Sequence, residues 1–412
     1  MLTRRVFLKK SALAMFGIGT APAWLARALS ASEAPASRKK VLVAIFQRGA
    51  MDGLNVVIPH GEAAYYALRP NLAIPRPDGT ANSAIDLDGF FGLHPALAPL
   101  KPIYDAGRLA AIHATGSPDP TRSHFDAQDY MESGTPGLKT TSDGWLNRAL
   151  LPEKIASAVR AVSVGTELPR ALRGLNEAVA IDNLNNFQVR EAEAAPSFEK
   201  MYSATRDRVL NGAGRDTFQA IKTIEAIRKQ PYLPANGAQY PNGKLGQEMM
   251  QIARLIKADV GLEVAFTDLG GWDHHVNEVG AHPTEGRLAT LLAQFGQALA
   301  AFYTDLGDRM EQVAVITMSE FGRTARENGS RGTDHGHANV MLAMGGPIQG
   351  GRVYGEWPGL EREQLYEERD LNVTTDFRDV LSELVVRHLG NPHSAVVFPG
   401  YESPKFRGFV TA

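Results

Sequence analysis

The sequence contains no cysteine. This absence excludes disulfide bonds, thiolate zinc sites and cysteine nucleophiles together. Any transition metal would therefore have to bind through His, Asp, Glu, Asn or hydroxyl ligands. The lack of disulfides does not argue against export, because exported proteins need not contain them.

The sequence also lacks an excess of either charge. It has 43 Lys and Arg against 45 Asp and Glu, which gives a net charge of −2. No basic stripe with interleaved aromatic residues occurs, so we expect no nucleic-acid partner. Internal repeats and low-complexity tracts are absent as well. The 412 residues, 44% hydrophobic and 21% charged, are typical of a globular protein with a large core, in one α/β domain or in two or three domains.

The N-terminus resembles an export signal. Arg4 and Arg5 precede a modest apolar stretch from Ser11 to about Leu25, and small residues at 28–34 offer cleavage sites. This pattern predicts a twin-arginine signal peptide over residues 1–34, with the twin-arginine machinery as partner and the periplasm or cell exterior as destination. An amphipathic helix or an uncleaved anchor is the alternative. The apolar stretch is short for a membrane span, so we expect membrane contact only through an uncleaved leader.

From residue 38 onward, strand and helix patterns alternate. Continuous apolar, β-branched runs predict buried strands at 41–46, 109–116, 262–267, 313–317 and 340–344. Helical patterns cover 94–109, 122–134, 245–259, 287–308 and 375–390. This rhythm predicts one α/β domain over 38–412, with a mainly parallel central sheet and helices on both faces. A stretch at about 150–239 departs from the rhythm, and we interpret it as a largely helical insertion.

Polar side chains gather next to the predicted strands. They are Asp52; Thr121, Arg122, Ser123 and His124; Asp273, His274 and His275; Ser319, Glu320 and Arg323; and Asp334, His335 and His337. Ligands of parallel α/β sheets bind outside the carboxyl ends of the strands, so we expect these groups to converge there. Carboxylates and imidazoles together bind zinc, manganese or iron, and a hydroxyl beside such a metal becomes a nucleophile at neutral pH.

The least ordinary cluster is the segment TDHGH. Histidine accounts for only 11 of the 412 residues, and four of these lie in two short loops. The other clusters each have a structural explanation. Asp52 could form a turn, Ser123 could cap a helix, and Glu320 could form a surface ion pair. The metal hypothesis therefore depends on the convergence of several clusters.

The order of these segments resembles the superfamily of alkaline phosphatases, sulfatases and cofactor-independent phosphoglycerate mutases. More closely, the whole mature chain resembles the bacterial family catalogued as domain of unknown function 1501. The segments that carry this resemblance are FQRGAMDGLNVVIP, RSHFDAQDYMESG, GGWDHH, SEFGRT and GTDHGHA. A twin-arginine leader is also usual in that family. The resemblance implies an alkaline-phosphatase-like fold, although the family has no settled reaction.

The resemblance also implies roles for individual residues. The metal ligands that it implies are Asp52, Asp273 and His275, with His335 or His337 as the last histidine. Glu320 can also bind a metal, and Asp334 with His335 could supply the Asp-His pair that the superfamily has elsewhere. Ser123 matches the nucleophile, with Thr121 as the second choice. Arg122 would neutralise charge on the ester oxygens. His274 occupies a position that the family pattern leaves open, and Glu320 stands where the superfamily usually has an Asp-His pair.

These observations lead to a functional hypothesis. The chain is expected to be an exported hydrolase of phosphate or sulfate esters that uses a serine nucleophile and one or two divalent metal ions. Zinc is the first choice of metal, with manganese, iron or calcium as alternatives, and the substrate is a small-molecule or glycan ester. The competing hypothesis is a non-catalytic periplasmic binding protein that retains the hydrolase fold, and the departure at Glu320 supports it.

Overall fold

The computed structural model describes residues 39–153, 156–186, 219–229 and 231–411. The predicted signal peptide at 1–34 lies outside the described residues. The compact unit spans Lys40–Ala412. Across the part of the chain that the structure describes, none of the helices combines the length and apolarity needed to cross a membrane.

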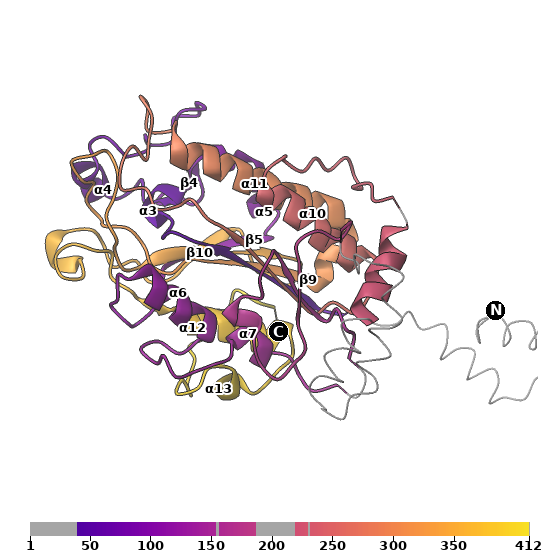
Figure 1. The fold of residues 1–412 in the computed structure, drawn as a ribbon. Coiled ribbons are helices and arrows are strands. Elements are labelled where there is room, and N and C mark those ends of the chain that lie inside the picture. Colours follow the sequence, from indigo (N-terminus) through magenta and orange to yellow (C-terminus); the bar gives the residue numbers. More distant parts are fainter. Residues whose placement is uncertain (1–38, 154–155, 187–218, 230, 412) are drawn as a thin grey trace, which may run out of the picture. The chain divides into compact units, whose positions relative to one another are not determined.

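A nine-stranded sheet forms the centre of this unit (Figure 1). Eight strands follow the order β11-β5-β10-β9-β1-β8-β6-β7, and β12 pairs with β5. Their bounds are β1 (Val41–Gln47), β5 (Leu109–Gly116), β6 (Ala161–Val164), β7 (Val179–Ile181), β8 (Val264–Leu269), β9 (Val313–Met318), β10 (Asn339–Gly345), β11 (Arg352–Tyr354) and β12 (Thr375–Asp376). A smaller sheet has the order β2-β4-β3, formed by Val57–Ile58, Gly92–Leu93 and Ile85–Asp86. The α/β fold with a mostly parallel sheet is as predicted.

One strand of the main sheet runs in the opposite direction. β10 is antiparallel to both neighbours, β5 and β9, whereas the other pairings are parallel. The segment before β10 therefore reaches the edge at which the parallel strands end. In an all-parallel sheet, residues before a strand would lie at the opposite edge. This reversal brings the TDHGH segment to the other polar clusters.

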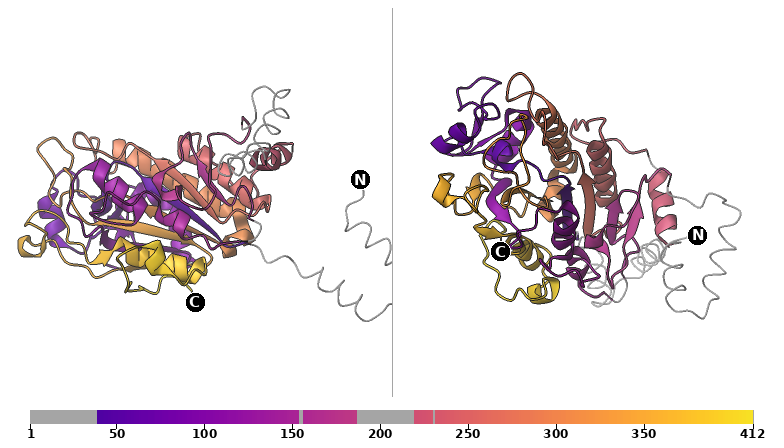
Figure 2. Two further views of the ribbon diagram at one scale, coloured as in Figure 1. Left: turned by 60° about the horizontal axis from the view of Figure 1, so that its bottom comes forward. Right: turned by 60° about the vertical axis from the view of Figure 1, so that its left-hand side comes forward.

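The sheet is covered by helices on both faces, which agrees with the prediction. One face packs against η1 (Pro95–Leu100), α5 (Lys101–Asp105), α10 (Lys244–Lys257) and α11 (Arg287–Leu306). The other packs against α6 (His124–Ser133), α7 (Trp145–Arg148), α12 (Phe377–Glu383), η5 (Leu384–His388) and α13 (Ser394–Val397). Figure 2 shows the two layers of helices from two further directions. Further helices among the described residues are α3 (Gly53–Val56), α4 (Ala63–Leu68), η2 (Arg170–Leu172), η3 (Gly307–Gln312) and η4 (Arg362–Gln364).

Strand β1 shows why the sheet is buried on both sides. Val43 and Ile45 belong to the hydrophobic cluster under α10 and α11, whereas Leu42, Ala44 and Phe46 belong to the opposite cluster. Successive side chains of a strand point to opposite faces, so a strand between two helical layers needs an uninterrupted apolar run. The sequence of β1 meets this requirement.

Part of the region predicted as an insertion belongs to the main sheet. Strands β6 and β7 lie within 150–239 and belong to the main sheet, so this part is not an insertion. Residues 219–228 are helical. Much of the helix-prone stretch lies at 187–218, outside the described residues, and its helical character stays a prediction.

Candidate metal centre

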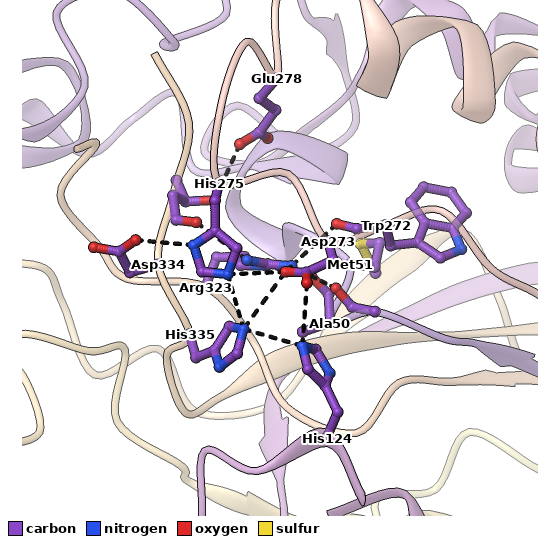
Figure 3. A network of polar contacts seen from close by, with 12 residues as sticks. Ala50, Met51, His124, Trp272, Asp273, His275, Glu278, Arg323, Asp334 and His335 are labelled. Atoms are coloured by element: carbon purple, nitrogen blue, oxygen red, sulfur yellow. Dashed lines mark hydrogen bonds and ion pairs between the residues drawn. The ribbon is translucent and has the colours of Figure 1, made fainter. Parts of the chain in front are cut away.

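Three imidazole rings meet at the carboxyl edge of the sheet (Figure 3). His124 is the first residue of α6, His275 follows β8, and His335 precedes β10. The Nε2 atom of His335 lies 3.0 Å from Nε2 of His124 and 2.9 Å from Nε2 of His275. Three segments that are far apart in the sequence therefore place Nε2 of His124 and Nε2 of His275 each within about 3 Å of Nε2 of His335.

The carboxylate of Asp273 completes this cluster. Its Oδ1 lies 3.0 Å from Nε2 of His275 and 3.5 Å from Nε2 of His335, and its Oδ2 lies 3.5 Å from Nε2 of His124. The ligand atoms of His124, Asp273 and His335 all lie within 4.8 Å of one another. We call these four residues the metal cluster.

Each ring of the metal cluster has an oxygen acceptor at its other nitrogen. Nδ1 of His124 lies 2.7 Å from Oε1 of Glu320, and Nδ1 of His275 lies 3.0 Å from Oδ1 of Asp334. Nδ1 of His335 lies 2.9 Å from the carbonyl oxygen of Arg122. A carbonyl or carboxylate oxygen only accepts, so each Nδ1 must donate, and in a neutral ring Nε2 is then unprotonated.

This arrangement fits a metal ion. The Nε2 lone pair of His335 faces those of His124 and His275 across about 3 Å, and each pair repels unless a proton or a cation lies between the two atoms. Histidine ligands of metals commonly donate their other nitrogen to a carboxylate or a carbonyl, which fixes the ring and its tautomer. Zinc–nitrogen bonds of about 2.0–2.1 Å in tetrahedral geometry separate two ligands by about 3.3 Å, so the rings would need to open by about 0.4 Å.

Buried Arg323 ties the loops of the site together. Its guanidinium donates to the carbonyl of Ala50 at 2.6 Å, to the carbonyl of Thr333 at 3.1 Å and to Oδ1 of Asp273 at 2.7 Å. Burial alone would raise the pKa of Asp273, but the hydrogen bond and the charge of Arg323 outweigh burial and lower it. Asp273 therefore stays ionised, as a metal ligand must.

Two glycines allow these loops to approach closely. A Cβ on Gly49 would lie 2.8 Å from the backbone nitrogen of Asp273, and the φ of Gly49 is +117°. A Cβ on Gly332 would lie 2.5 Å from the carbonyl carbon of His275. Real Cβ atoms do not tolerate such distances, and a φ of this value is disfavoured outside glycine. Larger residues at either position would therefore displace the ligand loop.

The electrostatic surroundings differ among the rings. The hydrogen bond to Glu320 raises the pKa of His124, although its partial burial works in the opposite direction. Burial lowers the pKa of His335, and its contact with the Arg122 carbonyl only partly offsets this. The hydrogen bond from His275 lowers the pKa of Asp334. The side chains of Asp273 and His275 are 46% and 40% exposed, so the metal cluster is open to solvent.

Comparison with known proteins shows which family this sequence belongs to. The family described as Protein of unknown function (DUF1501) matches residues 107–397, more than half of the chain and all of the metal cluster. The chain belongs to the DUF1501 family. No curated protein matches the sequence. The family resemblance seen in the sequence is thereby confirmed.

Two solved sulfatase structures are similar to this DUF1501 protein at low identity. The PsFucS1 sulfatase from Pseudoalteromonas sp. is 12% identical with a TM-score of 0.41, over 94% of this chain and 75% of that chain. BT1596, a 2-O GAG sulfatase, is 11% identical with a TM-score of 0.26, over 76% of this chain and 65% of that chain.

Asp52, predicted as a metal ligand, lies outside the metal cluster. It follows β1 as expected, but its carboxylate is buried and binds Arg69 through both oxygens, at 2.5 and 3.0 Å. Burial would raise the pKa of Asp52, yet the charge and hydrogen bonds of Arg69 lower it. Within the described residues, a single group of ligand atoms lies within 4.8 Å of one another; it comprises His124, Asp273 and His335, and contains neither Asp52 nor His275. The structure thus supports one metal site of the one or two predicted.

Three other predicted ligands have different positions. Glu320 and Asp334 stand behind His124 and His275 and orient these rings through Nδ1. His337 points elsewhere, because its Nε2 lies 3.0 Å from the carbonyl of Ser117. Among the predicted ligands, Nε2 of His275 and Nε2 of His335 thus lie next to the carboxylate of Asp273. His274, left open by the sequence, is buried, and burial lowers its pKa to about 4.

The predicted catalytic residues lie next to the metal cluster. Ser123 is the exposed N-cap of α6, and its Oγ accepts a long hydrogen bond of 3.5 Å from the backbone nitrogen of Asp126. Oγ1 of Thr121 accepts from the nitrogen of Ser123 at 3.2 Å. The guanidinium of Arg122 binds Asp370 at 2.6 Å, so its backbone carbonyl, not its charge, is what contacts the metal cluster.

His124 is the residue of the metal cluster for which the sequence indicated no role. It stands in a polar segment between a predicted strand and a predicted helix, and histidines are scarce in this chain. A scarce histidine at the start of a predicted helix, next to Ser123, was therefore the feature of the sequence that could have indicated a role for His124. Ser123 drew attention because a hydroxyl suggests a nucleophile, whereas the ring beside it belongs to the group that could hold a metal ion.

Proposed function

We propose that this DUF1501 protein is a metal-dependent hydrolase of phosphate or sulfate esters. The observation that carries the proposal is the convergence of three Nε2 atoms on Asp273 while each Nδ1 is bound to an oxygen. Catalytic zinc sites use a few nitrogen and carboxylate ligands and keep a position open for water or substrate. The group His124, Asp273 and His335 supplies three ligand atoms, which would leave the fourth position of a tetrahedral zinc ion open.

The donor set favours zinc, manganese or iron. Imidazole suits these metals, whereas calcium prefers six to eight oxygen ligands. Zinc remains our first choice because imidazole and carboxylate groups are among its usual ligands. A divalent ion in this position supplies Lewis-acid chemistry, which polarises an ester oxygen and makes an oxygen nucleophile available at neutral pH.

The chain's own residues prepare the site for this chemistry. Glu320, Asp334 and the Arg122 carbonyl hold the proton of each ring at Nδ1. Arg323 keeps Asp273 ionised. The rings and the carboxylate are thus ready to bind a cation, with little rearrangement during the reaction. Preorganised charges of this kind are a main source of catalysis when charge develops on an ester oxygen.

Ser123 remains the proposed nucleophile. It directly precedes the ligand His124, its side chain is exposed, and its single hydroxyl contact is the 3.5 Å cap bond within α6. A bond of this length is weak, so rotation of the side chain toward the metal cluster costs little. Its N-cap role is also what favours the competing function, a metal-binding protein without catalysis.

Export is a further part of the proposal. The leader carries Arg4 and Arg5 ahead of a modest apolar stretch, which supports transport by the twin-arginine machinery to the periplasm or cell exterior. That route carries folded proteins, so the metal site can form before export.

A combined experiment tests the proposed function. The metal content of the purified mature protein is measured, and the metal-loaded protein is screened against aryl phosphates and aryl sulfates. The proposal expects bound metal and hydrolysis of at least one ester class, both lost on chelation. Metal-loaded protein without hydrolysis across the screen would favour the binding protein, and failure to bind any metal would exclude both.

A further inference from the structure

A cavity of about 720 Å³ lies beside α6 at the carboxyl edge of the sheet. Its walls come from the residues that follow β1 and β6, from the end of β8, and from α6 itself. This volume falls within the range of small-molecule sites. None of the four residues of the metal cluster lines the cavity.

Gln128 connects this cavity to the metal cluster. It lines the cavity one helical turn after His124, and its Nε2 donates to Oε1 of Glu320 at 2.9 Å. The same Glu320 oxygen accepts from Nδ1 of His124 at 2.7 Å. On the cavity side, Arg48 donates to Oε1 of Gln128 at 3.0 Å. Two hydrogen bonds therefore separate the cavity wall from a ligand ring.

The charges of the cavity wall largely compensate one another. An alternating series runs from Glu132 to Arg48 at 2.8 Å, to Asp268 at 2.6 Å, to Lys244 at 2.6 Å and to Glu248 at 3.7 Å. Cations already held between carboxylates have little attraction left for a phosphate or sulfate group. Their remaining donor and acceptor positions can still form hydrogen bonds.

The other two cations of the cavity wall also have partners. Arg170 is paired with Asp129, and Arg173 donates through Nε to the carbonyl of Leu168 at 3.2 Å. Over the whole wall, four cations face six carboxyl groups. Burial raises the pKa of Glu248 to about 7, so near neutral pH its carboxyl is present both as donor and as acceptor. An anion gains little here, whereas a neutral group rich in hydroxyls finds many partners.

Phe125 gives the cavity an aromatic surface. It lines the cavity, stands next to His124 in the sequence and is 89% exposed. An exposed ring of this kind adds little to the core. Its face carries partial negative charge and attracts C–H groups, which the flat side of a sugar ring presents.

We infer that this cavity binds the neutral, polyhydroxylated alcohol part of the substrate, such as a sugar ring, while the metal centre receives the anionic ester group. The inference rests on the proposed function for its second half. Its first half, a site for neutral polyols next to the metal cluster, depends on the ion-paired wall and on Phe125 alone.

Calorimetric titration with neutral methyl glycosides and disaccharides tests the inference, with inorganic phosphate as the anionic probe. Metal-free and zinc-loaded mature protein are both titrated. At least one neutral sugar should bind both forms, and Phe125→Ala should weaken that binding about fivefold or more. Leu233→Ala, which truncates an 82% exposed side chain outside this cavity, should leave it unchanged. Phosphate should bind the zinc-loaded form only.

The inference is wrong if no sugar binds either form, if Phe125→Ala binds sugars as the unaltered protein does, or if phosphate displaces the sugar from metal-free protein. Because these titrations need no turnover, they separate the two proposals. Ester hydrolysis without sugar binding would remove the inference and leave the proposed function. Sugar binding that responds to Phe125→Ala, without hydrolysis of any ester, would support the polyol site and remove the proposed hydrolase function.

Discussion

Replacing Glu320 by glutamine tests whether the oxygen behind His124 prepares the site for metal. Oε1 of Glu320 accepts from Nδ1 of His124 at 2.7 Å, from the nitrogen of Gly49 at 2.8 Å and from Nε2 of Gln128 at 2.9 Å. Glu320→Gln keeps the shape and an acceptor oxygen but removes the charge. Loss of such a partner typically costs about 10- to 100-fold in metal affinity, equivalent to about 1.4–2.8 kcal/mol.

The assay is a competition titration of zinc against a fluorescent chelator, with thermal unfolding of the metal-free protein recorded in parallel. Glu311→Gln is the matched control, because Glu311 forms an exposed ion pair with Arg108. The control should bind zinc as the unaltered protein does. If Glu320→Gln binds zinc as tightly as this control while remaining folded, His124 is not a ligand oriented by Glu320.

The pH dependence of zinc binding gives a second test of the Glu320–His124 contact. The hydrogen bond to Glu320 raises the pKa of His124. A proton on Nε2 competes with the metal, so a raised pKa moves the midpoint of metal binding to higher pH. Glu320→Gln lowers this pKa, and the midpoint should therefore move to lower pH while affinity at alkaline pH falls. A midpoint that moves upward would contradict the assigned contact.

Three further substitutions test other parts of the account. Ser123→Ala should retain metal and lose ester turnover by orders of magnitude in a steady-state assay; if it loses about 0.5–2 kcal/mol of stability and keeps turnover, Ser123 is only a cap. Asp52→Asn should reduce the free energy of unfolding by about 3–5 kcal/mol, because Arg69 is left buried and unpaired, yet leave the metal content unchanged; loss of metal would make Asp52 a ligand. Replacing Arg4 and Arg5 with lysines should leave the precursor in the cytoplasm, and normal export in cell fractionation would show that the leader works otherwise.

The central strands could be predicted because they are buried on both faces. The apolar runs at 41–46 and 313–317 correspond to β1 and β9, whose side chains are all buried. The helix predicted at 94–109 was less regular. It is a 3-10 segment followed by a short α-helix, and Pro99 lies inside the first of these. Proline removes a hydrogen-bond donor and crowds the preceding turn, which the apolar periodicity alone does not reveal.

The sequence located the site but not the atoms that form it. Polar residues beside strand ends did converge, and Asp273, His275 and His335 meet as expected. Spacing cannot distinguish a carboxylate that binds metal from one that orients a histidine, so it did not indicate that Glu320 and Asp334 contact Nδ1 of His124 and His275. The pairing of Asp52 with Arg69, 17 residues later, depends on a loop path that has no sequence periodicity.

The direction of β10 was the other missing element. An apolar run indicates a buried strand but carries no information about its orientation in the sheet. Asp334 and His335 therefore join the other clusters as expected, for a reason that the sequence did not contain, whereas His337 contacts the Ser117 carbonyl instead. Reversal of β10 between β5 and β9 places His335 at the shared edge.

Metal content tests the central claim most directly. Elemental analysis of the mature protein, with two single substitutions in parallel, separates the metal cluster from its neighbours. The account predicts about one zinc, manganese or iron ion per chain in the unaltered protein and in His337→Ala. It predicts loss of that ion in His335→Ala. A protein that carries no metal, and whose thermal stability no such ion increases, would contradict the account.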